Sequence, residues 1–104
     1  MGAEDFSDVA RGKDAQEAFR SAVEEAQYEY GHGGYTGSIA EKHGFIMVAR
    51  EPLASEEARK LKSRMEEEDD RYNDKWGPAC CVELLEESPV KGSRLFWFFG
   101  IASS

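Results

Sequence analysis

Apolar side chains recur every three or four residues between residues 15 and 30, a spacing that predicts an amphipathic helix. Asp14 followed by Glu17 resembles a capping box at the start of this helix. Gly31 stands where a residue in the left-handed conformation would end it. The predicted buried stripe consists of Ala15, Ala18, Phe19, Ala22, Val23, Ala26 and Tyr30.

A second helix is predicted to begin at Ser55, a preferred capping residue, with two glutamates in its first turn where the helix dipole favours negative charge. The apolar pattern lapses at residues 68–69, so the far end is expected to fray or to leave the core. Gly77 and Pro78 end the helix, because proline cannot continue it. The predicted buried stripe consists of Ala58, Leu61, Met65, Tyr72 and Trp76.

Four short segments are predicted to be strands. Residues 38–42 and 45–49 flank a His-Gly turn and predict a hairpin, while residues 79–85 and 95–101 form two apolar runs. The last run is aromatic on both faces, which is typical of a central strand or of one covered by a partner.

The order of these elements predicts a compact α+β domain at residues 14–104, with the order α-β-β-α-β-β. Its sheet is expected to be antiparallel, with both helices packed on one face. Residues 1–13 carry only Phe6 and Val9 as larger apolar side chains, so a flexible lead-in is expected there.

The formal net charge of −8 over 104 residues disfavours direct binding to nucleic acid and to anionic lipid, because their phosphates are repelled. It favours either plain solubility or attraction to a basic partner. The longest apolar runs fall far short of the ~20 residues of a membrane span, so a cytoplasmic protein is expected. Cys80 and Cys81 are adjacent, and neither a disulfide nor a zinc site is expected from them.

A glycine-rich segment, Gly-His-Gly-Gly-Tyr-Thr-Gly, occupies residues 31–37. Its backbone amides and hydroxyls predict a ligand-binding loop for a phosphate or a nucleotide, with a lysine to balance charge. The known phosphate loops precede a helix, whereas this segment follows one. The segment is therefore interpreted first as a helix stop with a turn into the sheet, while a ligand-binding loop and a partner-contact loop stay open as alternatives. The candidate ligand-binding residues are His32, Gly33, Gly34, Tyr35, Thr36, Ser38 and Lys42.

His32 and His43 are the two histidines of the chain, and no nucleophile or second histidine stands at a recognisable spacing from either. We therefore assign no catalytic residue, no metal site and no cofactor.

Five successive carboxylates, residues 66–70, form a second conspicuous feature. On a helix they repel one another at positions three and four apart, with partial relief from neighbouring lysine and arginine. They predict either a solvated helix face or an acidic arm for a basic groove, with two aromatic anchors beside it. The candidate partner-binding residues are Glu66, Glu67, Glu68, Asp69, Asp70, Tyr72 and Trp76.

Three segments together resemble a class of small, largely uncharacterised proteins of phages and mobile elements. They are residues 29–39 (EYGHGGYTGSI), 74–79 (DKWGPA) and 98–103 (FFGIAS), and the similarity spans residues 14–104. Where this chain has Ile101, the class commonly has tryptophan. The resemblance carries no catalytic residue, and it implies a role against host defence or host metabolism, in the host cytoplasm.

Three hypotheses follow. The first is a non-enzymatic acidic binding protein that inhibits a host protein with a basic surface, such as a nucleic-acid-handling defence complex, in the manner of an anti-CRISPR inhibitor. The second is a nucleotide binder or hydrolase that uses the loop at residues 31–38. The third is a structural or self-assembling homo-oligomer that uses the aromatic strand.

Overall fold

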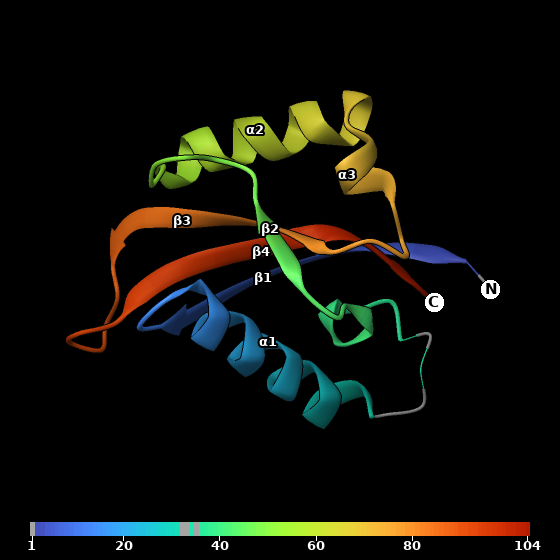
Figure 1. Ribbon diagram of the computed structural model, residues 1–104, viewed down its shortest axis with the longest axis horizontal. Helices are drawn as coiled ribbons and strands as arrows, with labels where there is room; N and C mark the ends of the chain where they lie inside the picture. Colours follow the sequence, from blue (N-terminus) through green and yellow to red (C-terminus); the bar gives the residue numbers. More distant parts are fainter. Residues whose placement is uncertain (1, 32–33, 35) are drawn as a thin grey trace.

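The computed structural model describes residues 2–31, 34 and 36–104, and over these residues the chain forms an α+β fold as predicted. A mixed four-stranded sheet has the order β1-β4-β3-β2. Helix α1 lies on one face of the sheet, and α2 and α3 lie on the other (Figure 1). The elements are β1 (Ala3–Gly12), α1 (Ala15–Tyr30), the 3-10 helix η1 (Ile39–Glu41), β2 (Phe45–Met47), α2 (Ser55–Glu68), α3 (Asp70–Asn73), β3 (Ala79–Glu87) and β4 (Arg94–Ser103).

Strand β4 is central, which is one of the two alternatives that its two apolar faces left open. Phe98 packs on the α1 side and Phe99 on the side of α2 and α3, because successive residues of a strand point to opposite faces. Phe19 of α1 meets Phe45 and Phe98 with ring centroids 5.3 and 5.6 Å apart. Each buried ring of this kind contributes roughly 1.5–3 kcal/mol by leaving water.

The expectation that both helices pack on one face is wrong, and so is that of a purely antiparallel sheet. Cys80 and Cys81 are both fully buried on opposite faces of β3, so each face of the sheet needs its own helical cover. Strand β2 runs parallel to β3, with Phe45 opposite Ala79. The crossover through α2 and α3 makes this pair parallel, whereas an antiparallel sheet was expected.

Residues 3–12 form β1 rather than a flexible lead-in. Phe6 is the buried large side chain of this strand, whereas Val9 is 57% exposed, so the apolar alternation of a half-buried strand is weak. The strand is specified instead by its antiparallel pairing with β4, which runs without a shift from Ala3 opposite Ser103 to Gly12 opposite Arg94.

The predicted bounds of α1 are confirmed. Asp14 accepts a hydrogen bond from the backbone N–H of Glu17 at 2.9 Å, and Gly31 follows the last helical residue with a φ of 86°. The helix predicted to begin at Ser55 does begin there, but Ala54 is its N-cap and Ser55 Oγ donates to Glu86 instead.

The second helix ends earlier than predicted, at Glu68. Asp69 then caps α3 by accepting from the N–H of Arg71, so the chain turns where the apolar pattern lapses. Residues 38–42 do not form a strand. Ser38 Oγ accepts from the N–H of Ala40 at 3.2 Å and caps η1, which is a local hydrogen bond that competes with extended structure.

Lys42 follows η1 and is buried, with a relative exposure of 5%. Its Nζ donates to the carbonyl oxygens of Asp74, Lys75 and Gly77 at 3.1, 3.3 and 2.9 Å. Burial lowers the pKa of this ammonium. The lysine therefore joins the segment after η1 to the turn that leads into β3.

We predict that Lys42→Met destabilises the protein by about 2–3 kcal/mol, because methionine keeps much of the stem volume but leaves three carbonyls without their charged donor. Urea unfolding measures this change. Lys60→Met on the exposed face of α2 is the matched control and is expected to change stability by less than about 0.5 kcal/mol. Equal effects of the two substitutions would show that the contacts of Lys42 carry no stability.

Candidate functional site

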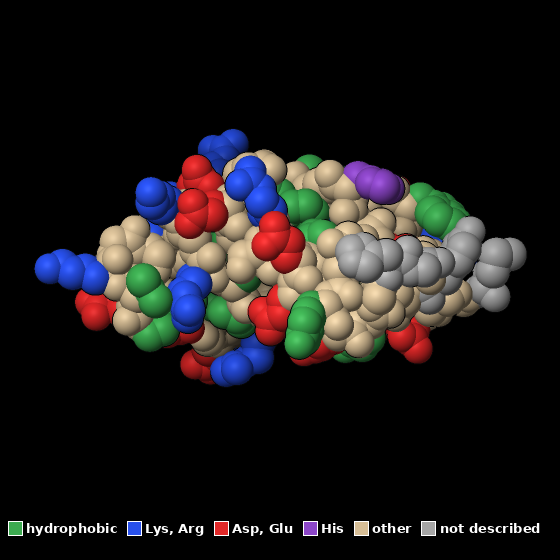
Figure 2. Space-filling model, turned by 90° about the horizontal axis from the view of Figure 1, so that it is seen from below, with side chains coloured by type: hydrophobic (Ala, Val, Ile, Leu, Met, Phe, Trp, Pro, Cys, Tyr) green, Lys and Arg blue, Asp and Glu red, His purple; other side chains and the backbone are tan. Residues whose placement is uncertain are grey.

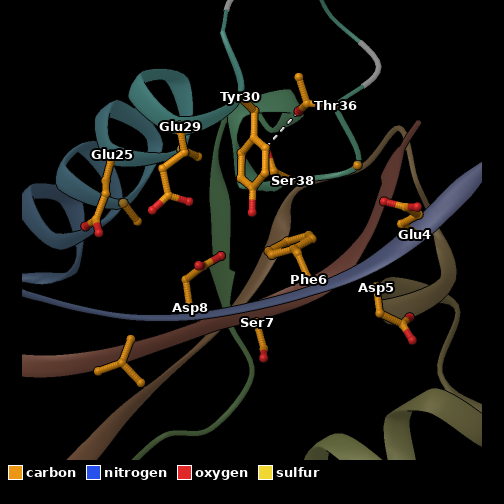
Figure 3. A pocket seen from close by; sticks show the side chains of 14 residues that line it. Glu4, Asp5, Phe6, Ser7, Asp8, Glu25, Glu29, Tyr30, Thr36 and Ser38 are labelled. Atoms are coloured by element: carbon orange, nitrogen blue, oxygen red, sulfur yellow. Dashed lines mark hydrogen bonds between the residues drawn. The ribbon is translucent and has the colours of Figure 1, made fainter.

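A groove with a volume of about 340 Å³ lies between β1 and the C-terminal half of α1 (Figure 3). Its described lining holds five carboxylates and no lysine, arginine or histidine. Thr36, Gly37 and Ser38 also line it. We call it the acidic groove. Its acidic lining residues are Glu4, Asp5, Asp8, Glu25 and Glu29, of which Asp5 points away from α1 and accepts from the Tyr72 hydroxyl on the other face of the sheet (Figure 3).

Three of these carboxylates face one another across the groove. Asp8 shares the α1 side of β1 with buried Phe6, and its side chain points towards α1 (Figure 3). Glu25 and Glu29 stand one turn apart on α1 and point towards β1. None of the three carboxylates makes a hydrogen bond or an ion pair with any residue in the described part of the chain. Within the described residues, their charges are therefore uncompensated.

The electrostatics of Asp8 reflect this arrangement. Partial burial, followed by the negative charges of Glu25 and Glu29, raises the pKa of the Asp8 carboxyl. In the view from the α1 side, lysine and arginine side chains gather over the left half of the molecule, whereas the C-terminal half of α1 lies towards the right (Figures 1 and 2). A cationic group that entered the groove would relieve the repulsion among the three carboxylates.

The described part of the predicted ligand-binding loop is occupied by its own contacts. The hydroxyl oxygens of Thr36 and Ser38 lie 2.7 Å apart. Glu41 Oε2 accepts from both the N–H and the hydroxyl of Thr36, at 3.1 and 2.8 Å. These hydroxyls therefore stabilise the turn into η1.

The remaining candidates for that loop do not join them. The ammonium of Lys42 lies on the carbonyls before β3, and Gly34 is exposed with a φ of 79°. His32, Gly33 and Tyr35 lie outside the described residues. Among the described candidates, the structure does not bring the lysine to the hydroxyls as a phosphate site would require.

The acidic run at residues 66–70 is partly neutralised from within. Glu66 is paired with Lys62 and accepts from the Tyr72 hydroxyl at 3.4 Å. Asp69 is paired with Arg71 at 2.7 Å, and the hydrogen bonds from that guanidinium lower the pKa of the Asp69 carboxyl. Three exposed carboxylates of the run, Glu67, Glu68 and Asp70, have no such partner among the described residues.

The two predicted aromatic anchors differ in exposure. Tyr72 is 1% exposed and packs on Phe99, so it belongs to the core and the expectation that it contacts a partner is wrong. Its hydroxyl donates to Asp5 at 3.0 Å, which joins α3 to β1. Trp76 is 68% exposed and is available at the surface.

The acidic groove itself was not predicted from the sequence. Glu25 and Glu29 were recognisable as an acidic pair at helical spacing, but Asp8 was not placed beside them because residues 3–12 were not expected to form a strand. The sequence signal for the strand is the placement of Phe6, Asp8 and Ala10 at every second position, which puts all three on the same face of a strand.

Comparison with known proteins gives no family model, no curated protein and no solved structure that matches the chain significantly. In the described residues, no helix has the length and apolar character to cross a membrane. No group of histidine, cysteine and carboxylate side chains in that part of the chain is arranged to hold a metal ion. Inference about function therefore depends on the groove and the surfaces around it.

We predict that Asp8→Asn stabilises the protein at neutral pH. The raised pKa of Asp8 means that the folded state binds this proton more tightly than the unfolded state, so stability falls as pH rises above the ordinary carboxyl pKa near 3.9. The gain is fully present at pH 7 and is lost below about pH 3. Because the side chain is only partly shielded from water, solvent screening limits the gain to about 0.5 kcal/mol.

Urea unfolding of the wild type and of Asp8→Asn, at about pH 7 and again at about pH 3, measures this difference in stability. Glu24→Gln on the same helix is the control, because Glu24 does not line the groove. A wild-type protein and an Asp8→Asn variant with the same stability at both pH values would rule out repulsion in the groove.

Proposed function

We propose that this chain is a non-enzymatic binding protein whose acidic groove receives basic side chains of a protein partner. The observation that supports this proposal most directly is a groove with four carboxylates on the α1 side of β1, Glu4, Asp8, Glu25 and Glu29, and no cation in its described lining. An uncompensated charge cluster costs folding free energy, and a basic partner offsets that cost when it binds. The net charge of −8 adds long-range attraction to the same partner.

The groove is a better candidate than the acidic run at residues 66–70. Two of the five carboxylates in the run are already paired with Lys62 and Arg71. Asp8, Glu25 and Glu29 have no such pairing in the described part of the chain. A basic partner therefore gains more attraction at the groove, where no internal ion pair has to be broken first.

Inhibition of a host protein that handles nucleic acid is consistent with this chemistry. Such a protein presents a basic surface for phosphates, and an acidic protein bound there would compete with nucleic acid. The role in defence or metabolism is supported by the resemblance of residues 29–39, 74–79 and 98–103 to phage and mobile-element proteins.

The other two hypotheses receive less support. The nucleotide-binding alternative needs Lys42 beside Thr36 and Ser38, whereas its ammonium is engaged with three carbonyls. Self-assembly through the aromatic strand needs an open edge on β4, which is flanked by β1 and β3.

We predict that neutralising the groove weakens binding of a basic peptide. The test uses a labelled decapeptide of alternating arginine and threonine, with affinity measured by fluorescence anisotropy at low ionic strength. The combined substitutions Asp8→Asn, Glu25→Gln and Glu29→Gln are expected to weaken binding roughly ten- to thirtyfold, at about 0.5–0.7 kcal/mol for each exposed charge.

The matched control removes the same three charges from the acidic run, by Glu67→Gln, Glu68→Gln and Asp70→Asn. It is expected to weaken binding less than about threefold, through the change in net charge alone. Equal losses in the two triple variants would show that the groove is not the binding site. No binding of the peptide by the wild-type protein would overturn the proposed function.

A further inference from the structure

The backbone hydrogen bonds of β1 alternate in a way that leaves one edge open. Gly2 and Ser104 exchange both of their backbone hydrogen bonds, at 2.9 and 3.1 Å. The register from this pair to Gly12 opposite Arg94 has no shift. In an antiparallel pair the bonded and non-bonded positions alternate, so even-numbered residues of β1 bond to β4. The odd-numbered residues direct their N–H and C=O groups away from β4.

That outer edge has no strand beside it. Strand β1 is an edge strand of the sheet, whose order is β1-β4-β3-β2. Helix α1 packs on a face of the sheet and not beside this edge (Figure 1). No backbone hydrogen bond to the outward groups is found among the described residues. An open edge of this kind is a template for another strand. The outward positions are Ala3, Asp5, Ser7, Val9 and Arg11.

The acidic groove lies along the same strand. A strand added beside β1 would place every second side chain on the α1 side of the sheet, next to Asp8 and opposite Glu25 and Glu29. Its other side chains would lie beside Ser7 and Val9 on the opposite face, where both are exposed. Charge complementarity therefore selects lysine or arginine at alternate positions of the added strand.

We propose that β1 binds an extended basic segment of a partner protein as a fifth strand of the sheet, with lysine or arginine at every second position in the acidic groove. This inference rests on the proposed function and specifies the form of the ligand. Main-chain hydrogen bonds to the edge supply affinity, and the carboxylates supply the preference for basic side chains.

A second copy of this chain is a poor occupant of the edge. Pairing two β1 strands would bring two acidic grooves together, and Arg11 is the sole basic side chain of the strand. Like charges on adjacent strands are destabilising. The carboxylates therefore oppose self-pairing and attract a basic strand.

Peptides of equal charge test the backbone part of this proposal on the wild-type protein. The alternating arginine-threonine decapeptide is compared with a block peptide of five arginines followed by five threonines, and with alternating peptides that are N-methylated at every second amide, in either phase. The alternating peptide is expected to bind about tenfold more tightly than the block peptide. At least one methylated phase should lose binding about tenfold, because it lacks the donors that face β1.

A substitution in β1 gives an independent test. Ser7→Pro removes an outward N–H and is expected to leave the β1–β4 hydrogen bonds in place, since the N–H of Ser7 faces away from β4. Ser7→Ala is the control. We expect Ser7→Pro to fold, as judged by circular dichroism, and to lose about tenfold in affinity for the alternating peptide while Ser7→Ala binds as the wild type does. If Ser7→Pro fails to fold, the methylated peptides decide the question.

The outcomes separate this inference from the proposed function. Equal binding of the alternating, block and methylated peptides, all weakened by neutralising the groove, would overturn strand addition and keep the acidic binding site. Failure of every basic peptide to bind would overturn both. A dimer that forms through β1 in solution would also overturn the proposal, because the edge would then be occupied by a second copy.

Discussion

The pairing of the two chain ends, β1 with β4, is the constraint on which the rest of the structure depends. Strand β4 is apolar on both faces, so its backbone groups are buried and need partners along both edges. Strand β3 pairs with one edge of β4. Strand β1 pairs with the other edge, over ten residue pairs. Covering β4 in this way moves the open edge of the sheet outward to β1.

The charges around that new edge follow the same physics. Natural sheets protect an open edge with charged side chains, because an unprotected edge pairs with other chains. Here Asp8 on the strand and Glu25 and Glu29 on the neighbouring helix concentrate negative charge along the edge. Repulsion keeps identical edges apart, and in the binding mode that we propose the same field attracts an extended basic segment. On this proposal, protection against self-association and selection of a partner arise from one arrangement.

The sequence predicts the elements whose signals are local. The helix from Ala15 to Tyr30 has a cap, a stripe and a glycine stop, and the central position of β4 follows from its two apolar faces. Residues 3–12 were missed because their pairing partner lies at the other end of the chain. The placement of the helices on opposite faces is not a local signal either, because Cys80 and Cys81 are each covered by elements distant in sequence, on opposite faces of β3.

The candidate site was harder to predict than the fold. It requires the register of β1, the rotation of α1 and the distance between them, and none of these is local in sequence. The described parts of the two conspicuous features, the glycine-rich segment and the acidic run, carry structural contacts instead. Thr36 of the glycine-rich segment donates to Glu41. Glu66 and Asp69 of the acidic run are paired with Lys62 and Arg71. Residues that stand out in composition therefore stabilise the fold here, whereas an inconspicuous aspartate contributes to the groove.

Amide hydrogen exchange along β1 in the free protein tests the central claim most directly. The edge assignment predicts slow exchange at Phe6, Asp8 and Ala10, whose N–H groups bond to β4, and much faster exchange at Ser7 and Val9. Residue-resolved exchange measured by NMR would show this alternation. Uniform protection of odd-numbered and even-numbered residues would mean that the outer edge is already paired, and would contradict both the open edge and the binding mode inferred from it.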